Sequence, residues 1–232
     1  VWAHESGHRL SITTKSDLVV RDLELLQRVQ QHNHLRLHIT VTTLDPTLAR
    51  LLEPGAPTPR TRISTMKTLT QAGIEVDAFV MPILPGLTDG EKDLDTLFEV
   101  LAEVGVRTVV CDALFLRSPS KEVFFQFLRQ ELPEKEEEYR RRYDTSVYAS
   151  PLYVEQLRAR VERLRCRWNL LGAPRAASYR AEGGTASGEG SRVVLGRSPR
   201  IRIWQVPLRR TPSLPKRSPP RSHGVAQLRL FE

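Results

Sequence analysis

Polar and turn-forming residues follow four apolar runs in this sequence, and their types could do chemistry together. Lys15 follows the first run, Thr42 and Thr43 end the second, residues 82–86 end the third, and Arg117 follows the fourth. An ammonium group, two hydroxyls and the backbone of a Pro-Gly turn suit an anionic ligand that carries hydroxyl groups. Loops that contact water are also polar, so the residue types alone leave both a binding site and ordinary loops open.

These residues can meet only if the four runs form one sheet. The runs are rich in β-branched residues and cover residues 10–14, 35–43, 76–84 and 108–115. Each is followed by a segment with helical periodicity, which indicates parallel strands joined by crossover helices. Ligands bind beyond the carboxyl ends of the strands in such sheets. We therefore predict an α/β fold that gathers the polar residues at one end of the sheet, with further helices near 134–145 and 150–168.

The charge of the chain is concentrated in its last part. The whole sequence of 232 residues carries a net charge of +8. Residues 173–232 hold 12 basic and 3 acidic residues, so this segment carries 12 − 3 = +9 and the rest 8 − 9 = −1. Such a basic, Pro- and Gly-rich segment buries too little apolar surface to offset its ordering entropy. We predict a folded body over residues 1–172 and a disordered basic tail over residues 173–232.

Composition excludes two further classes of protein. No stretch of about 18 uncharged apolar residues occurs, which excludes a transmembrane helix. The first residues have no signal-peptide design, and we expect a cytoplasmic protein. Only two cysteines are present, Cys111 and Cys166. Two thiols exclude a disulfide scaffold, and they also exclude a three-thiolate iron–sulfur site built from this chain alone.

Four sequence blocks, taken in order, give a more specific indication. They are residues 11–16 with Arg21-Asp22-Leu23, residues 39–45, residues 52–57 with Arg60 and Arg62, and residues 71–74 with 81–89. Together, over residues 8–130, they resemble radical S-adenosylmethionine (SAM) proteins of the spore photoproduct lyase-like group. The resemblance implies a partial (β/α)₆ barrel of the TIM type. It also implies a 4Fe–4S cluster, held by a CxxxCxxC loop after the first strand, whose fourth iron binds S-adenosylmethionine.

The sequence departs from that group because it contains no CxxxCxxC motif, and what it matches is the later strands of the barrel. We therefore expect the C-terminal part of such a protein, with four parallel strands and one open sheet edge. The resemblance implies S-adenosylmethionine and a 4Fe–4S cluster in the full-length parent. We expect neither to bind stably to this chain alone, and we expect this chain alone to be inactive.

The resemblance assigns part of the S-adenosylmethionine site to residues of this chain. Lys15 would contact the methionine carboxylate, and Thr42 and Thr43 would reach the ribose hydroxyls. The adenine-flanking segment consists of Pro82, Ile83, Leu84 and Gly86. Its apolar side chains would cover the base, and the backbone near Gly86 would meet the edge of the base. A solvated lysine, packed threonines and a plain turn after a buried strand are the structural alternatives. No catalytic residue and no metal ligand can be named.

The tail ends in a sequence that resembles the pentapeptide by which bacterial DNA polymerases and repair proteins bind the β-sliding clamp. Its matching residues are Gln227, Leu228, Leu230 and Phe231. Arg229 departs from the motif, whose third position is usually Ser or Asp. The positive charge of the tail also favours nucleic acid as a partner, although a solvated basic linker is the simpler alternative.

We predict three regions in the chain. Residues 1–131 form the barrel units, residues 132–172 a helical extension, and residues 173–232 the tail. The leading hypothesis is a fragment of a radical SAM, iron–sulfur-dependent enzyme that carries the nucleoside side of the cofactor site and acts in DNA repair or modification. The alternative is a non-catalytic, degenerate half-barrel that binds DNA or the sliding clamp through its tail.

Overall fold

The structure, a computed structural model, describes residue 7 and residues 9–171. Its strands are β1 (Arg9–Thr14), β2 (His34–Thr40), β3 (Val76–Ile83) and β4 (Thr108–Ala113). They form one sheet in the order β1-β2-β3-β4, and all three neighbouring pairs are parallel. A 3-10 helix, η1 (Asp17–Asp22), follows β1. The α-helices of this part of the chain are α1 (Leu23–His32), α2 (Pro46–Leu52), α3 (Pro59–Gln71), α4 (Glu91–Glu103), α5 (Ser120–Glu131), α6 (Pro133–Tyr143) and α7 (Pro151–Arg167). The predicted α/β fold with four parallel strands is confirmed.

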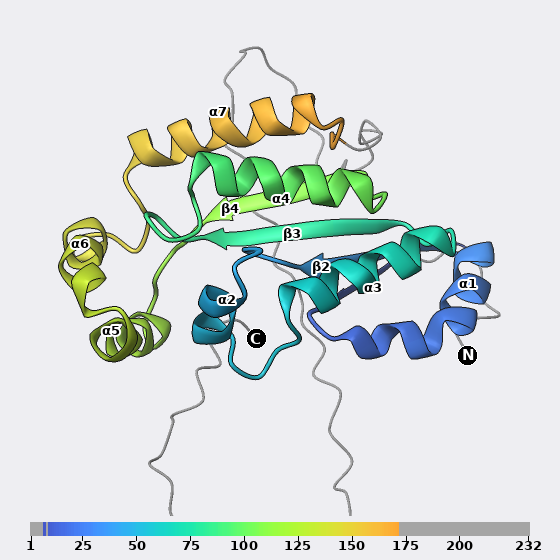
Figure 1. Ribbon diagram of the computed structural model, residues 1–232, viewed down its shortest axis with the longest axis horizontal. Coiled ribbons are helices and arrows are strands. Elements are labelled where there is room, and N and C mark those ends of the chain that lie inside the picture. Colours follow the sequence, from blue (N-terminus) through green and yellow to red (C-terminus); the bar gives the residue numbers. More distant parts are fainter. Residues whose placement is uncertain (1–6, 8, 172–232) are drawn as a thin grey trace, which may run out of the picture. The chain divides into compact units, whose positions relative to one another are not determined.

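The apolar runs form the core because alternate residues of each strand point to the same face of the sheet. In β2, the side chains of Leu35, Leu37 and Ile39 are buried, and the register places Ile39 beside Thr14 and Ala78. These strand residues join buried side chains of α1, α3, α4 and α7 in the main core. Figure 1 shows α4 and α7 running side by side along the sheet.

A second apolar cluster lies beyond the C-terminal end of the sheet. Leu84, Leu114 and Leu116 follow β3 and β4, and they pack with the buried aromatic side chains of α5 and α6. In α6, Tyr139 and Tyr143 are the buried residues, and most other positions are charged. Figure 1 shows α2, α5 and α6 at the end toward which the strand arrows point. These helices therefore lie at the end of the sheet where the sequence predicts a site.

The two outer strands of the sheet have different surroundings. On the β4 side, Arg165 of α7 donates from Nε and Nη2 to the carbonyl oxygen of Val109, at 2.9 and 2.6 Å. Thr108 also forms an isolated antiparallel bridge with Leu171. On the other side, no strand among the described residues pairs with the outer edge of β1. Over residues 9–171 the sheet is therefore not closed into a barrel.

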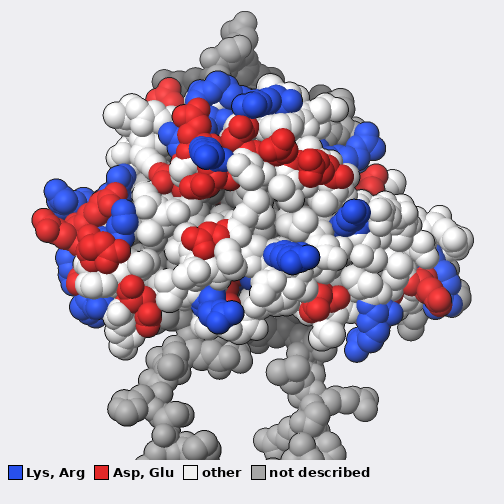
Figure 2. Space-filling model, in the orientation of Figure 1, with Lys and Arg blue, Asp and Glu red and all other residues white. Residues whose placement is uncertain are grey.

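Charged side chains of the body are mixed in sign on its surface. Figure 2 shows Lys and Arg interspersed with Asp and Glu over α6 and over α4 and α7. Several of them form ion pairs, for example Arg142 with Glu138 at 2.9 Å and Arg167 with Asp95 at 3.0 Å. On the face that is shown, the body presents no large basic patch to a nucleic-acid backbone. None of the helices in residues 9–171 is both long enough and apolar enough to cross a membrane.

Candidate functional site

Lys15 lies directly after β1 and is tied to the loop that follows α2. Its Nζ is 3.1 Å from Oε1 of Glu53, the C-cap residue directly after α2. The second oxygen of Glu53, Oε2, accepts a hydrogen bond from Nη2 of Arg62 in α3. The side chain of Lys15 is 27% exposed, whereas those of Glu53 and Arg62 are 8% and 3% exposed. Lys15 is therefore the member of this group that a ligand can reach.

Arg62 fastens the loop between α2 and α3 to the end of β2. Its Nη1 donates to the carbonyl oxygen of Thr40 at 3.0 Å, and its Nε donates to that of Pro57 at 2.9 Å. With the bond to Glu53, the planar guanidinium thus reaches three different segments, a geometry that its fixed array of donors allows. Arg62 has a structural role in the loop, whereas Arg60 is exposed.

Lys15 and Arg62 both contact the carboxylate of Glu53, at the C-terminal end of β1 and β2. Of these three side chains, that of Lys15 is the most exposed. A partly buried positive charge favours an anionic ligand group. The methionine carboxylate of S-adenosylmethionine has the charge that this position fits.

The two threonines that were predicted as ribose contacts follow the end of β2 but differ in their surroundings. Thr42 is buried, with 7% of its surface exposed. Thr43 is half-buried, and its Oγ1 accepts a hydrogen bond from the backbone N–H of Asp45 at 3.1 Å. Asp45 in turn caps α2, since its Oδ1 accepts from the N–H groups of Thr47 and Leu48. The hydroxyl of Thr43 retains its hydrogen as a donor.

The segment after β3 divides into buried and accessible residues. Ile83 belongs to the main core and Leu84 to the second cluster, and both are at most 2% exposed. Pro82 is half-buried and Gly86 is exposed. Of the predicted adenine-flanking residues, Pro82 and Gly86 are therefore the ones that a base can contact directly. Ile83 and Leu84 anchor the segment by packing into the main core and the second cluster, respectively.

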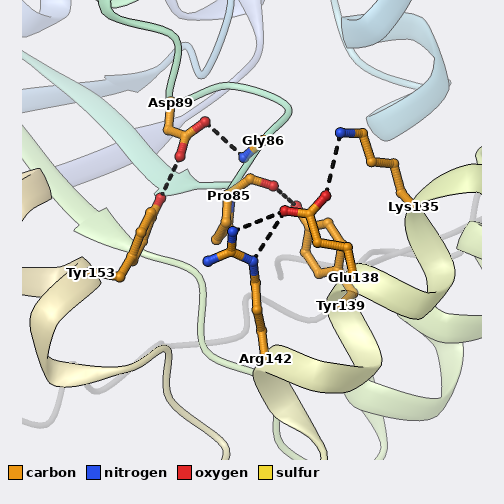
Figure 3. A network of polar contacts seen from close by, with 8 residues as sticks. All are labelled: Pro85, Gly86, Asp89, Lys135, Glu138, Tyr139, Arg142 and Tyr153. Carbon is orange, nitrogen blue, oxygen red and sulfur yellow. Dashed lines mark hydrogen bonds and ion pairs between the residues drawn. The ribbon is translucent and has the colours of Figure 1, made fainter.

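The turn over residues 85–89 is held by hydrogen bonds that sequence reasoning did not identify (Figure 3). The N–H of Gly86, a residue with a φ of 70°, donates to Oδ1 of Asp89 at 2.7 Å. Tyr153 of α7 donates its hydroxyl hydrogen to Oδ2 of Asp89 at 3.0 Å. Tyr139 of α6 donates to the carbonyl oxygen of Pro85 at 2.8 Å. Asp89 lies at the end of the block quoted for the resemblance, but no local pattern links it to a tyrosine of a distant helix.

Protonation states in this network follow from burial and from neighbouring charge. Burial, followed by the nearby carboxylate of Asp89, raises the pKa of Tyr153, so its hydroxyl remains a donor. Burial also raises the pKa of Tyr139. Burial by itself would raise the pKa of Glu138. The hydrogen bond from Arg142 and the charges of Lys135 and Arg142 outweigh this effect, so the pKa of Glu138 lies below its usual range. Glu138 is therefore ionised beside Gly86.

The residues of the described part do not fit an iron–sulfur cluster. Within residues 9–171, no three His, Cys, Asp or Glu side chains lie close enough together to hold a metal ion. Cys111 is half-buried in β4, and burial raises the pKa of its thiol to about 12. Cys166 is exposed on α7. Within residues 9–171, the two cysteines therefore lie in separate elements, β4 and α7.

The sequence singled out two further positions. Arg117, after β4, donates to the hydroxyl of Tyr148 at 2.9 Å and is exposed. The tail residues that resemble the clamp-binding pentapeptide lie outside the described residues; they are Gln227, Leu228, Leu230 and Phe231.

Comparison with known proteins relates this chain to one family. A family model described as the radical SAM superfamily matches residues 3–107, somewhat less than half of the chain. An uncharacterized protein of Mycobacterium tuberculosis is 35% identical over 177 residues, which are 76% of this chain and 52% of that protein. One of Methanocaldococcus jannaschii is 33% identical over 128 residues, which are 55% of this chain and 46% of the relative. The chain spans about half the length of the curated relatives it matches.

Solved structures show a similar fold for this chain. A spore photoproduct lyase mutant with bound AdoMet and dinucleoside spore photoproduct superposes with a TM-score of 0.52 at 19% identity, over 69% of this chain and 48% of that chain. Another mutant of spore photoproduct lyase gives a TM-score of 0.54 at 17% identity, over 72% of this chain and 51% of that chain. The predicted resemblance to the spore photoproduct lyase-like group is thereby confirmed at the level of the fold.

Proposed function

We propose that this chain supplies the nucleoside side of the S-adenosylmethionine site in a radical SAM, iron–sulfur-dependent enzyme. The observation that carries the proposal is the set of groups at the C-terminal end of the sheet. The ammonium group of Lys15 stands half-buried beside Glu53, whose carboxylate Arg62 also binds. Thr42 and Thr43 follow the neighbouring strand, and the exposed backbone of Gly86 follows the next one. In parallel sheets these positions surround the ligand.

Each residue would have a separate task toward the cofactor. Lys15 would bind the carboxylate through a charge-assisted hydrogen bond. The threonine hydroxyls would bind the ribose, and Pro82 with the backbone of Gly86 would contact the adenine. In radical SAM enzymes, S-adenosylmethionine and a reduced 4Fe–4S cluster together supply a 5′-deoxyadenosyl radical. The described residues offer no ligands to that cluster, so we expect this chain alone to bind S-adenosylmethionine weakly, at roughly millimolar concentrations.

A titration followed by NMR tests the assignment of Lys15. The ¹⁵N-labelled chain is titrated with S-adenosylmethionine and, in parallel, with 5′-deoxyadenosine, which lacks the carboxylate. We expect amide shifts at Thr42, Thr43 and Gly86 with both ligands and tighter binding of S-adenosylmethionine. Lys15→Ala should abolish that preference, since a hydrogen bond to a charged group contributes about 1.5–3 kcal/mol. Lys67→Ala, on an exposed position of α3, is the matched control.

The outcome separates the parts of the proposal. If Lys15→Ala leaves the preference for S-adenosylmethionine over 5′-deoxyadenosine unchanged, Lys15 is not part of the site. An absence of shifts at all three amides, with both ligands at millimolar concentration, would remove the nucleoside site itself.

We propose nucleic acid as the substrate of the complete enzyme, in DNA repair or modification. Two observations support this choice: the fold is shared with spore photoproduct lyase structures that contain a dinucleoside spore photoproduct, and residues 173–232 carry the excess positive charge of the chain. A non-catalytic half-barrel is the second candidate, favoured by the lack of cluster ligands among the described residues. It would bind DNA or the β-sliding clamp through the tail. Catalysis-independent DNA binding that depends on the tail alone would favour this candidate.

A further inference from the structure

The turn over residues 85–89 is connected to helices that lie far along the chain. Three hydrogen bonds reach it from α6 and α7: Tyr139 to the carbonyl oxygen of Pro85, Tyr153 to the carboxylate of Asp89, and Arg160 to the carbonyl oxygen of Asp89. Inside the turn, the N–H of Gly86 is bound by the same carboxylate. Figure 3 shows Asp89 between Gly86 and Tyr153.

Asp89 uses each carboxylate oxygen for a different task. Oδ1 holds the N–H of Gly86 at 2.7 Å, and Oδ2 holds the hydroxyl of Tyr153 at 3.0 Å. Because the carboxylate is rigid, the position of Tyr153 sets the direction of Oδ1 and therefore the orientation of the Gly86 peptide. Hydrogen bonds to an ionised acceptor are stronger than those between neutral groups. The contact thus links helix α7 to the backbone at Gly86.

Gly86 has little freedom to move toward α6. A Cβ atom at this position would lie 3.2 Å from Oε1 of Glu138 and 3.3 Å from Nζ of Lys135. Glu138 itself is fixed by Arg142, at 3.2 and 2.9 Å, and lies 3.5 Å from Lys135. The Gly86 peptide is therefore enclosed by α6 on one side and bound by Asp89 on the other. When backbone groups are already fixed, ligand binding does not have to order a loop, and less free energy is lost on binding.

We infer that Asp89 and Tyr153 are positioning residues for the nucleoside site. Neither is assigned a contact with the ligand. Asp89 orients the Gly86 backbone toward the base, and Tyr153 of α7 holds Asp89 in place. The inference rests on the proposed function, because it specifies how the same site is built. It assigns to α7 a part in ligand binding, although this helix follows the last strand of the sheet.

The chain contains a matched control for Tyr153. Tyr143 is a buried tyrosine whose hydroxyl donates to the carbonyl oxygen of Leu114 at 2.9 Å, whereas Tyr153 is half-buried. Removing either hydroxyl costs one hydrogen bond of similar length, and the loss at Tyr143 should destabilise the fold at least as much. Only the Tyr153 hydroxyl is bonded to the residue that holds Gly86. A difference between Tyr153→Phe and Tyr143→Phe consequently reports positioning rather than a loss of stability.

The experiment compares four variants of the full chain: Tyr153→Phe, Tyr143→Phe, Asp89→Asn and Asp89→Ala. Affinity for 5′-deoxyadenosine is measured by NMR titration, and hydrogen exchange of the Gly86 amide is measured without ligand. We expect Tyr153→Phe and Asp89→Ala to weaken binding on the order of tenfold and to speed exchange at Gly86. Tyr143→Phe should bind as the wild type does. Asp89→Asn should recover most of the affinity, because its amide oxygen can still accept from Gly86.

Two results would overturn the inference, and they differ from the failure of the proposed function. One is equal affinity of Tyr153→Phe and Tyr143→Phe at similar melting temperatures. The other is an affinity of Asp89→Ala that equals that of Asp89→Asn, with unchanged exchange at Gly86. Both require that the wild type binds the nucleoside. If the wild type shows no shifts at Gly86, the proposed site itself is wrong, and the positioning role fails together with it.

Discussion

The hydroxyl of Tyr153 donates to Oδ2 of Asp89 at 3.0 Å, across 64 positions of the sequence. Asp89 belongs to the turn after β3, and Tyr153 lies in the first turns of α7. The region that we predicted as a helical extension, residues 132–172, therefore contacts the turn that would receive the nucleoside. A ligand site on this chain depends on packing between these two regions, in addition to the strand ends.

Arg62 is expected to be the most sensitive position of the candidate site for stability. Arg62→Ala removes the partner of the buried Glu53 and leaves the carbonyl oxygen of Thr40 without its donor. Loss of one member of a buried ion pair typically costs about 3–5 kcal/mol. Urea unfolding should show that the free energy of unfolding decreases by an amount near the lower end of this range, because Glu53 keeps its contact with Lys15. Arg60→Ala, at an exposed position of the same helix, should change the free energy of unfolding by less than about 0.5 kcal/mol. Equal effects of the two substitutions would contradict the role given to Arg62.

His38 is expected to make the stability depend on pH just below neutrality. Burial lowers its pKa from the ordinary value of 6.5; the charge of Asp77 opposes this and that of Arg36 adds to it. The unfolded chain therefore binds more protons than the folded chain just below pH 6.5, and the free energy of unfolding should fall as the pH is lowered through this range. His38→Gln should flatten this part of the profile. His34→Gln, at an exposed position of the same strand, should keep it. If His38→Gln leaves the pH profile of the free energy of unfolding unchanged, groups other than His38 cause the pH dependence.

The two thiols are expected to differ in reactivity. Burial raises the pKa of Cys111 to about 12, so its thiol stays protonated at neutral pH, whereas Cys166 is exposed. Since the thiolate is the reactive form, a thiol reagent should modify about one equivalent rapidly in the native chain. Cys166→Ser should abolish that rapid phase, and Cys111→Ser should leave it intact. Rapid modification of both thiols in the folded protein would contradict the burial of Cys111.

Reconstitution of this chain with iron and sulfide under anaerobic conditions should yield no stoichiometric cluster. Two cysteines in separate elements do not replace three clustered thiolates. The measurement is the visible absorbance of the desalted protein, together with its iron content. Stoichiometric uptake that disappears in Cys111→Ala or Cys166→Ala would overturn the expectation.

A peptide that spans residues 222–232 should bind a bacterial β-sliding clamp. Each of the apolar anchors Leu230 and Phe231 could contribute roughly 1.5–3 kcal/mol in a pocket, and ordering of the peptide offsets part of this. Micromolar affinity is therefore the expectation, measured by fluorescence anisotropy at high salt, where the basic residues are screened. Leu230→Ala with Phe231→Ala should abolish binding, and Arg229→Ala should not. If high salt alone abolishes binding of the unsubstituted peptide, the interaction is electrostatic and the match to the motif is accidental.

The fold was predictable because its signals are local. Continuous apolar runs gave the positions of β1 and β3 to within one residue, and β2 and β4 end three and two residues earlier than predicted. These two runs continue into buried residues such as Val41 and Leu114, which extend the apolar pattern beyond the last ladder pairing. The short helix α2 was not predicted, since its seven residues carry too little periodicity.

The candidate site was predictable only in part. Lys15, Thr42 and Gly86 follow strands, so their meeting at one end of a parallel sheet follows from the strand order. Whether a side chain is accessible is decided by tertiary packing. Leu84 is apolar and flanks the turn, yet it is taken up by the second cluster rather than presented to a ligand. The pairing of Asp89 with Tyr153 depends on how α7 lies against the turn, which no spacing within either segment encodes.

The guanidinium of Arg165 has a consequence for how copies of this protein meet one another. An outer strand with free carbonyl oxygens is a template for pairing with the same strand of another molecule, and such pairing leads to aggregation. Two donors of Arg165 already occupy the carbonyl oxygen of Val109, and a positive charge at this place repels its counterpart on a second copy. This contact makes strand pairing at the β4 edge less favourable near Val109. No strand among residues 9–171 lies beyond β1, so we expect pairing between copies to begin at that edge.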